Sequence, residues 1–123
     1  MLKLGITREE LENLLVESNR EVKLNPNNAD AYLGRAMVRH ALKDYTGAIA
    51  DYNQVTKLRP KDVSAYSNRA NARAESGDHK GAIAERTAAL KMDPNGVLSL
   101  FIYNDRGLSY LALGNPKSAI AKR

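Results

Sequence analysis

Prolines recur in this chain at a constant interval, and that interval constrains the fold more than any single residue does. Pro26, Pro60 and Pro94 each stand 34 residues apart. The same shift superposes Gly47-Ala48-Ile49-Ala50 on Gly81-Ala82-Ile83-Ala84. Self-similarity with a period of about 20–50 residues is typical of stacked repeats, which bury their apolar faces against one another. The chain is therefore expected to be an array of short structural repeats.

Residues that favour helix starts divide each repeat into two helices. Asp44 and Asp78 occupy matching positions, and Asn115 follows at a spacing of 37 instead of 34. Asp and Asn are both preferred N-cap residues. Pro116 comes directly after the third cap, at the helical position where proline is best tolerated. Each full repeat is therefore predicted to be a helix, a turn and a second helix.

The register also predicts the organisation of the chain. An N-terminal helix is expected to begin at a capping box formed by Thr7 and Glu10 and to end near Leu24. The change in spacing from 34 to 37 places three extra residues in or near the segment 96–99. The predicted segments are an N-terminal half repeat over 1–28, a repeat over 29–62, a repeat with a short insertion near its end over 63–99, and a truncated repeat over 100–123.

Small residues are expected where the two helices of one repeat cross, because they let two backbones approach closely. The matching small positions on the first and second helices are Ala36 with Ala48, Ala70 with Ala82, and Gly107 with Ala119.

Composition argues against several classes of protein. The 123 residues include no cysteine, which excludes disulfides, zinc-binding thiolates and thiol nucleophiles. No run of about 18 apolar residues is present, so no membrane-spanning helix is predicted, and the N-terminus lacks the pattern of a secretory signal. We therefore expect an intracellular, cytoplasmic protein. The net charge of +5 comes from 19 basic residues mixed with 14 acidic ones, without the dense basic clusters of a nucleic-acid surface.

The repeats resemble tetratricopeptide (TPR) repeats, whose pattern runs from a Trp through Leu-Gly and Tyr to a later Ala, Phe and Pro. Two repeats match in strict register and a third matches with one insertion. The matching residues are Tyr32, Ala36, Ala48, Tyr52 and Pro60, then Tyr66, Ala70, Ala82, Ala89 and Pro94, and then Tyr103, Gly107, Tyr110, Gly114 and Ala119.

Arginines mark the departures from the family pattern. They replace the Leu at Arg35, Arg69 and Arg106, the Tyr at Arg39 and Arg73, and the Phe at Arg86.

The resemblance implies an all-α fold, a right-handed α-solenoid of antiparallel helix pairs, that serves as a protein-protein interaction scaffold. It also implies a concave groove, lined by the first helix of each repeat, that binds a peptide or a partner helix. For Met37 and Leu108 the alternative is that they only cover neighbouring helices. The implied groove residues are Leu33, Met37, His40, Ser67, Asn68, Asn71, Ala74, Asn104, Leu108 and Leu111.

One TPR subfamily binds the C-terminal carboxylate of chaperones through a clamp of Lys, Asn, Asn, Lys and Arg. Asn68 matches the middle Asn of that clamp, but Asp105 stands where a cation is needed and would repel a carboxylate. We therefore do not predict that function, and Asn68 is expected to make a structural hydrogen bond between repeats.

The arginines suggest either an RNA-contacting array or a ladder of ion pairs. Asp51 and Glu85 recur on the second helices and are expected to pair with Arg69 and Arg106 of the following repeat. Long charged side chains at such borders usually pair or extend to solvent, so the ion-pair ladder is the favoured interpretation.

No enzyme is predicted. His40 and His79 have no paired carboxylate, phosphate-binding loop or metal-ligand spacing near them. His79 follows an N-cap and is expected to be solvated. No catalytic residue, cofactor or metal ligand is therefore assigned.

The apolar run from Val97 to Tyr103 supports an alternative function. It either packs on Leu90 and Met92 or leaves Leu98 and Phe101 exposed as an interface. In the second case the chain is a self-association or structural module of a larger protein, and a homo-oligomer through its terminal helices. The primary prediction is binding of a peptide or protein partner; RNA is the weakest alternative.

Overall fold

A computed structural model describes residues 5–114 of the chain, and these residues form six α-helices and no strand. The predicted all-α fold is confirmed. The chain divides into two compact units, residues 1–60 and 61–123. The helices α2, α4 and α6 begin at Ala29, Val63 and Ser99; the division into four segments stays a prediction.

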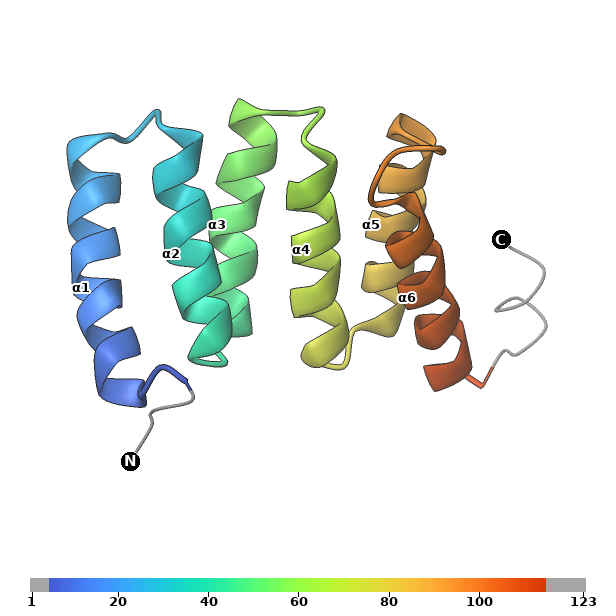
Figure 1. Ribbon diagram of the computed structural model, residues 1–123, viewed down its shortest axis with the longest axis horizontal. Helices are drawn as coiled ribbons and strands as arrows, with labels where there is room; N and C mark the ends of the chain where they lie inside the picture. The colour runs from blue at the N-terminus through green and yellow to red at the C-terminus, as the bar shows by residue number, and fades with distance from the viewer. Residues whose placement is uncertain (1–4, 115–123) are drawn as a thin grey trace. The chain divides into compact units, whose positions relative to one another are not determined.

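The first unit contains three helices, each running antiparallel to the one before it (Figure 1). They are α1 (Arg8–Leu24), α2 (Ala29–Ala41) and α3 (Tyr45–Leu58). The middle helix, α2, packs against both α1 and α3. Because α1 contributes no buried residue, the core of this unit lies mainly between α2 and α3.

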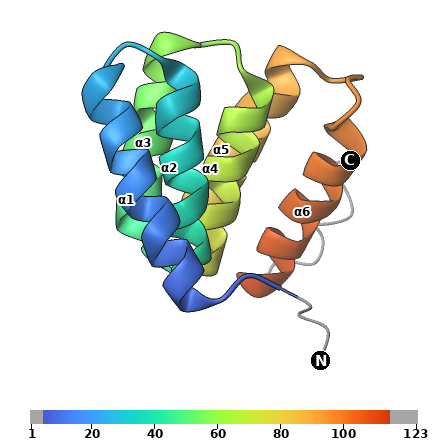
Figure 2. The same ribbon diagram turned by 60° about the vertical axis from the view of Figure 1, so that its left-hand side comes forward.

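The second unit repeats this arrangement with α4 (Val63–Glu75), α5 (His79–Met92) and α6 (Ser99–Ala112). Here α5 packs against both α4 and α6 (Figure 2). The three residues Ala89, Leu90 and Ile102 form a buried apolar cluster between α5 and α6. The second helix of this repeat, α5, thus packs against the first helix of its own repeat, α4, and the first helix of the next repeat, α6.

The predicted caps are present at the starts of the helices. Thr7 Oγ1 accepts a hydrogen bond from the Glu10 backbone N–H at 3.1 Å, and its hydroxyl donates to the Glu10 carboxylate at 3.0 Å. Asp44 and Asp78 accept from the backbone N–H of Gly47 and Gly81 at 3.0 and 2.9 Å. Each cap satisfies a backbone donor that the helix itself leaves without an acceptor.

Glycine is required at the third position of the second helices. A Cβ atom on Gly81 would lie 2.2 Å from an Asp78 carboxylate oxygen and 3.0 Å from Arg73 Cδ, and Gly47 is enclosed in the same way by its own cap. The cap therefore explains why Gly47 and Gly81 match across the repeat.

Small residues lie at the helix crossings, as predicted. Ala36 and Ala48 in the first unit, and Ala70 and Ala82 in the second, are all fully buried. Gly107 is partly buried on α6. The predicted cap Asn115, together with Pro116 and Ala119, lies outside the described residues.

The three extra residues lengthen mainly the connection between α5 and α6. That connection covers 93–98, whereas the corresponding connections cover 25–28 and 59–62. The helix α6 itself begins only at Ser99, and Ile102 of the apolar run packs on Leu90.

No helix among the described residues is both long and apolar enough to cross a membrane.

Candidate functional site

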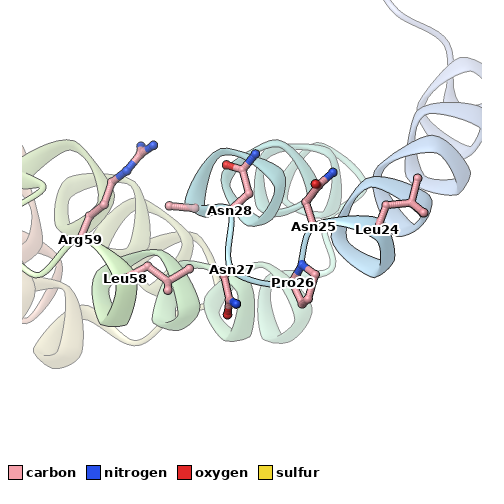
Figure 3. Close-up of a pocket in the computed structure, with 8 residues that line it drawn as sticks. Leu24, Asn25, Pro26, Asn27, Asn28, Leu58 and Arg59 are labelled. Carbon is pink, nitrogen blue, oxygen red and sulfur yellow. The ribbon is translucent and has the colours of Figure 1, made fainter.

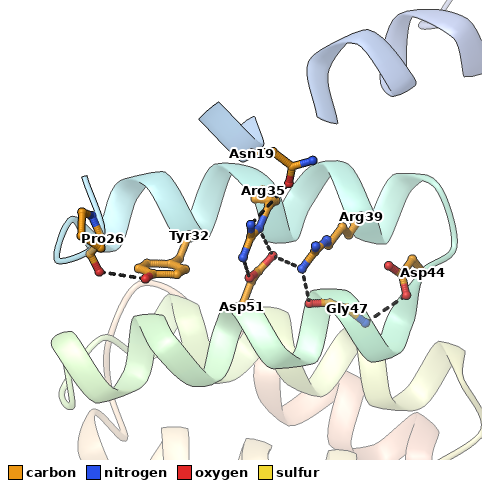
Figure 4. A network of polar contacts seen from close by, with 8 residues as sticks. All are labelled: Asn19, Pro26, Tyr32, Arg35, Arg39, Asp44, Gly47 and Asp51. Atoms are coloured by element: carbon orange, nitrogen blue, oxygen red, sulfur yellow. Dashed lines mark hydrogen bonds and ion pairs between the residues drawn. The ribbon is translucent and has the colours of Figure 1, made fainter. Parts of the chain in front are cut away.

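A buried carboxylate organises the polar contacts of the first unit (Figure 4). Asp51, on α3, is 2% exposed. Arg35 on α2 donates to both of its oxygens, from Nε at 3.0 Å and from Nη2 at 2.7 Å. Arg39 adds a third hydrogen bond from Nη1 at 3.0 Å. These hydrogen bonds to Asp51 raise the pKa of Arg35 despite its partial burial, and they tie α2 to α3.

The matching arginines also stack on tyrosines one helical turn earlier. The guanidinium carbons of Arg35, Arg69 and Arg106 lie 5.9, 5.0 and 5.3 Å from the ring centres of Tyr32, Tyr66 and Tyr103. These distances are in the range of cation–π contacts. An arginine in place of the family's leucine is thus held by an aromatic ring.

The structure corrects the predicted partners of the two acids. Asp51 pairs with Arg35 and Arg39 of its own repeat instead of Arg69, and Glu85 pairs with Arg69 of its own repeat instead of Arg106. The reason is geometric, because an acid on a second helix faces the first helix against which that repeat is folded. The ion pairs therefore join the two helices within one repeat.

Three predicted groove residues lie on α2 in the first unit. Met37 is 56% exposed, whereas Leu33 and His40 are half-buried. The His40 ring meets Tyr45 edge to face, with ring centres 5.5 Å apart. The α2 face thus offers one exposed apolar side chain between two partly buried ones.

The remaining predicted groove residues lie on α4 and α6 in the second unit. Those on α4 are half-buried, and those on α6 are exposed, Leu108 at 56% and Leu111 at 53%. Asn68 makes no side-chain hydrogen bond to any described residue, so the structural bond expected for it is not observed. The set on α4 is Ser67, Asn68, Asn71 and Ala74, and the set on α6 is Asn104, Leu108 and Leu111.

Two of these residues line one pocket in the second unit. The pocket has a volume of about 170 Å³, and Ala74 on α4 and Leu108 on α6 form two of its walls. We call it the Arg86 pocket, after the buried arginine among its other lining residues. Those residues are His79 and Arg86 from α5 and Asp105 and Ser109 from α6.

Arg86 is held at 4% exposure by neutral acceptors. Its Nη1 donates to Ser109 Oγ at 2.6 Å and to the Asp105 backbone oxygen at 3.3 Å. Its Nη2 donates to Asn71 Oδ1 at 2.8 Å. Burial lowers the pKa of Arg86, an effect that the nearby Asp105 charge partly opposes. The oxygen of Asn71 therefore accepts from Arg86, and its N–H donors remain for a ligand.

Reasoning from the sequence missed most of the Arg86 pocket. Arg86 was identified only as a departure from the family pattern, and the expectation that His79 is solvated is wrong. His79 is partly buried and lines the pocket, and its Nδ1 is buried without a partner among the described residues. The available signal was the 34-residue register, which aligns Arg86 with the aromatic Tyr52 and so predicts that Arg86 is buried.

Two further hollows lie in the first unit. One, of about 620 Å³, lies between the α1–α2 turn and the end of α3, where Leu58 and Arg59 face the Asn25–Asn28 turn (Figure 3). Arg59 also pairs with Asp30 at 2.9 Å. The other, of about 310 Å³, lies between α1 and α2. The lining of this second hollow includes the acidic residues Glu17, Glu21 and Asp30, so it differs in charge from the Arg86 pocket.

The predicted interface residues Leu98 and Phe101 are 36% and 66% exposed. Leu98 is the N-cap of α6 but makes no side-chain capping bond. Their neighbours Val97 and Leu100 are also exposed, at 93% and 63%. The start of α6 therefore presents a run of apolar side chains.

No group of three potential metal-ligating side chains is found among residues 5–114.

Comparisons with known proteins agree with the repeat pattern. A family model described as a TPR repeat matches residues 36–77, and no curated protein matches the chain. Among solved structures, a crystal structure of MamA is similar with a TM-score of 0.82 and 18% identity. The match covers 98% of this chain and 71% of the MamA chain. MamA from Desulfovibrio magneticus RS-1 has the same TM-score at 19% identity, and covers 92% of this chain and 62% of its own.

The MamA likeness shows the fold alone, because the identities are low. The TPR domain of Arabidopsis OM64 is similar at 26% identity with a TM-score of 0.67, and covers 76% of this chain and 78% of its own. The recurring caps, the small residues at the crossings and these matches agree on one repeat type. Residues 36–77 match the tetratricopeptide repeat model, and the described helices share the fold of the OM64 TPR domain.

Proposed function

We propose that this chain is a protein-interaction scaffold that binds a peptide or partner helix on the exposed faces of its first helices. Binding of this kind involves no turnover. The observation that supports it best lies in the second unit, where Leu108 and Ala74, two of the residues assigned to a groove from the repeat pattern, line a pocket. A pocket that combines apolar walls with a few polar groups is the usual form of a ligand-binding site.

The first unit supports the proposal through Met37. A methionine that is 56% exposed on a first helix offers flexible apolar surface that adapts to a partner's side chain. Each unit thus has an apolar contact residue at a groove position.

Selection of peptides from a random library, followed by measurement of their affinities, tests the proposal. Leu108→Asp or Met37→Asp is expected to weaken binding of the selected peptides at least tenfold, because loss of a central apolar contact typically costs about 2 kcal/mol or more. Val16→Asp on α1 is the matched control, since Val16 is 60% exposed and is not a groove residue. Peptides that bind both groove variants normally but lose binding to Val16→Asp would contradict the proposal.

Self-association is the second candidate, and the exposed run at the start of α6 favours it. Apolar patches of this kind often mark contacts with another protein. Phe101→Ser is then expected to convert an oligomer to a monomer in light scattering coupled to size exclusion, with little change in stability. A wild-type chain that remains monomeric across a concentration series would contradict this candidate.

The arginines do not favour the RNA alternative. Arg35, Arg39 and Arg69 are bound to buried or partly buried acids, and Arg86 is buried.

A further inference from the structure

Among residues 5–114, no counter-charge contacts the buried guanidinium of Arg86. No carboxylate among the described residues lies within ion-pair distance of its guanidinium, whose partners are an amide oxygen, a hydroxyl and a backbone oxygen. Buried charges in proteins are normally paired, because taking an ion out of water costs several kcal/mol. In Arg35 and Arg69 this chain shows the usual solution, an acid on the second helix.

Two hydrogen-bonding groups beside the same pocket have no partner. Arg86 Nε and His79 Nδ1 are both buried and make no hydrogen bond within the described residues. A buried polar group that lacks a partner costs about 1–3 kcal/mol. Both residues line the Arg86 pocket, so a ligand there can supply the missing acceptor once these side chains turn toward it.

The position of these groups on α5 adds to the positive potential. His79 is the first residue of α5 and Arg86 lies seven residues later, so the two project from the same side of the helix. The N-terminal end of a helix carries a partial positive charge. The cap Asp78 faces that end, but its carboxylate already accepts from Gly81 and from Arg73.

Asp105 is the charge that opposes an anion in this pocket. Its carboxylate makes no hydrogen bond or ion pair with a described residue, although its backbone oxygen accepts from Arg86. The balance between Asp105 and the cationic side of α5 decides which ligand binds. We infer that the buried arginine dominates, because a charge interacts more strongly at the low dielectric of the interior than at a partly exposed wall.

We propose that the Arg86 pocket binds the side-chain carboxylate of an aspartate or glutamate in a protein partner. The carboxylate accepts hydrogen bonds from Arg86 and His79, and the methylene groups above it pack between Ala74 and Leu108. A C-terminal carboxylate has no such apolar spacer and fits the walls less well. The pocket volume of about 170 Å³ is several times the roughly 30 Å³ that one water occupies in the liquid. One side chain therefore fits. This inference deepens the proposed scaffold function.

The test follows the Arg86 Nε–H signal by NMR during titration with N-acetyl-glutamate amide, which carries only a side-chain carboxylate. A saturable shift is expected with this probe and no saturable shift with N-acetyl-glutamine amide, its neutral isostere. N-acetylglycine, whose only carboxylate is terminal, is expected to bind more weakly. Equal binding of the glutamate and glutamine probes, or no saturable shift up to the solubility limit, would overturn the proposal. Tighter binding of N-acetylglycine would overturn the side-chain assignment.

The variant Asp105→Asn changes the charge of the pocket and leaves Arg86 in place. It therefore tests the proposal without a folding defect caused by replacing Arg86. Removal of a like charge at the pocket wall is expected to tighten the glutamate probe roughly two- to fivefold, whereas weaker binding would show that the pocket selects a cation and would overturn the proposal. Arg86→Tyr is expected to abolish binding. The titration with single residues tests only the Arg86 pocket, and the peptide selection tests the scaffold function. Failure of one experiment therefore does not contradict a positive result in the other.

Discussion

The two units place different side chains at the same buried position. Tyr52 in the first unit and Arg86 in the second are 34 residues apart, on α3 and α5, and are 2% and 4% exposed. The tyrosine buries a large apolar ring. The arginine instead requires Asn71, Ser109 and a backbone oxygen to replace water.

The residues around the two positions differ accordingly. Asn71, which accepts from Arg86, aligns with Met37 of the first unit. The repeat therefore accommodates either a tyrosine or an arginine at this buried position. A buried arginine without a carboxylate is an expensive way to fill a core, and this cost is the reason for our proposal that Arg86 binds a ligand.

The first prediction transfers the arginine to the first unit. Tyr52→Arg is expected to lower the free energy of unfolding by about 4 kcal/mol, because it removes a buried ring and introduces a charge opposite Met37 instead of an amide. Urea unfolding followed by circular dichroism measures the change. A loss below about 1 kcal/mol would show that the two interiors are interchangeable.

The second prediction tests the ion pairs that distinguish the first unit. Asp51→Ala is expected to cost about 3 kcal/mol, because it leaves Arg35 and Arg39 without their shared carboxylate. Glu12→Ala is the matched control: its pair with Arg8 is exposed, so about 0.5 kcal/mol or less is expected. Equal losses in the two variants, measured by the same unfolding experiment, would refute the structural role of Asp51.

The third prediction concerns the acceptors that hold Arg86. Ser109→Ala is expected to destabilise the chain by about 2 kcal/mol, since a hydrogen bond to a charged group contributes roughly 1.5–3 kcal/mol. Ser64→Ala, at an exposed site on α4, is expected to have almost no effect. If both serine variants unfold at the wild-type urea concentration, the Ser109 hydrogen bond contributes nothing.

The fourth prediction uses a difference in the turns within the two repeats. Lys43 and Gly77 occupy matching positions and have φ angles of 65° and 96°, a region that L-residues adopt only at a cost. Lys43→Gly is expected to raise stability by about 1 kcal/mol. The midpoint of thermal unfolding measures this, and a lower midpoint would contradict the argument from φ.

Much of the fold follows from the sequence because its determinants are local and repeated. Asp44, Asp78 and the small residues at the crossings recur at fixed spacing, and each acts on groups a few residues away or on the adjacent helix. The capping box at Thr7 and the helix ends before Pro60 and Pro94 follow from the same local chemistry. The change of register predicts extra residues near 96–99, but whether they enter a helix or a connection depends on how Ile102 docks on Leu90.

The contacts that involve side chains from several helices were not predictable in the same way. The partners of Asp51 and Glu85 depend on which neighbouring helix each carboxylate faces, and the register fits either neighbour. The Arg86 pocket requires His79, Asp105 and Ser109. The other repeats have different residue types at the matching positions. Only the alignment of Arg86 with Tyr52 indicated that a charge is buried there.

The stability of Arg86→Tyr tests the central claim most directly, because it gives the second unit the side chain that the first unit uses. If Arg86 is retained for a ligand, replacement by tyrosine is expected to leave the free energy of unfolding unchanged or to raise it, by up to about 2 kcal/mol, since buried charges are often replaced by apolar groups without loss. A loss of more than about 2 kcal/mol in urea unfolding would show that Arg86 is a structural residue, and the account would be wrong.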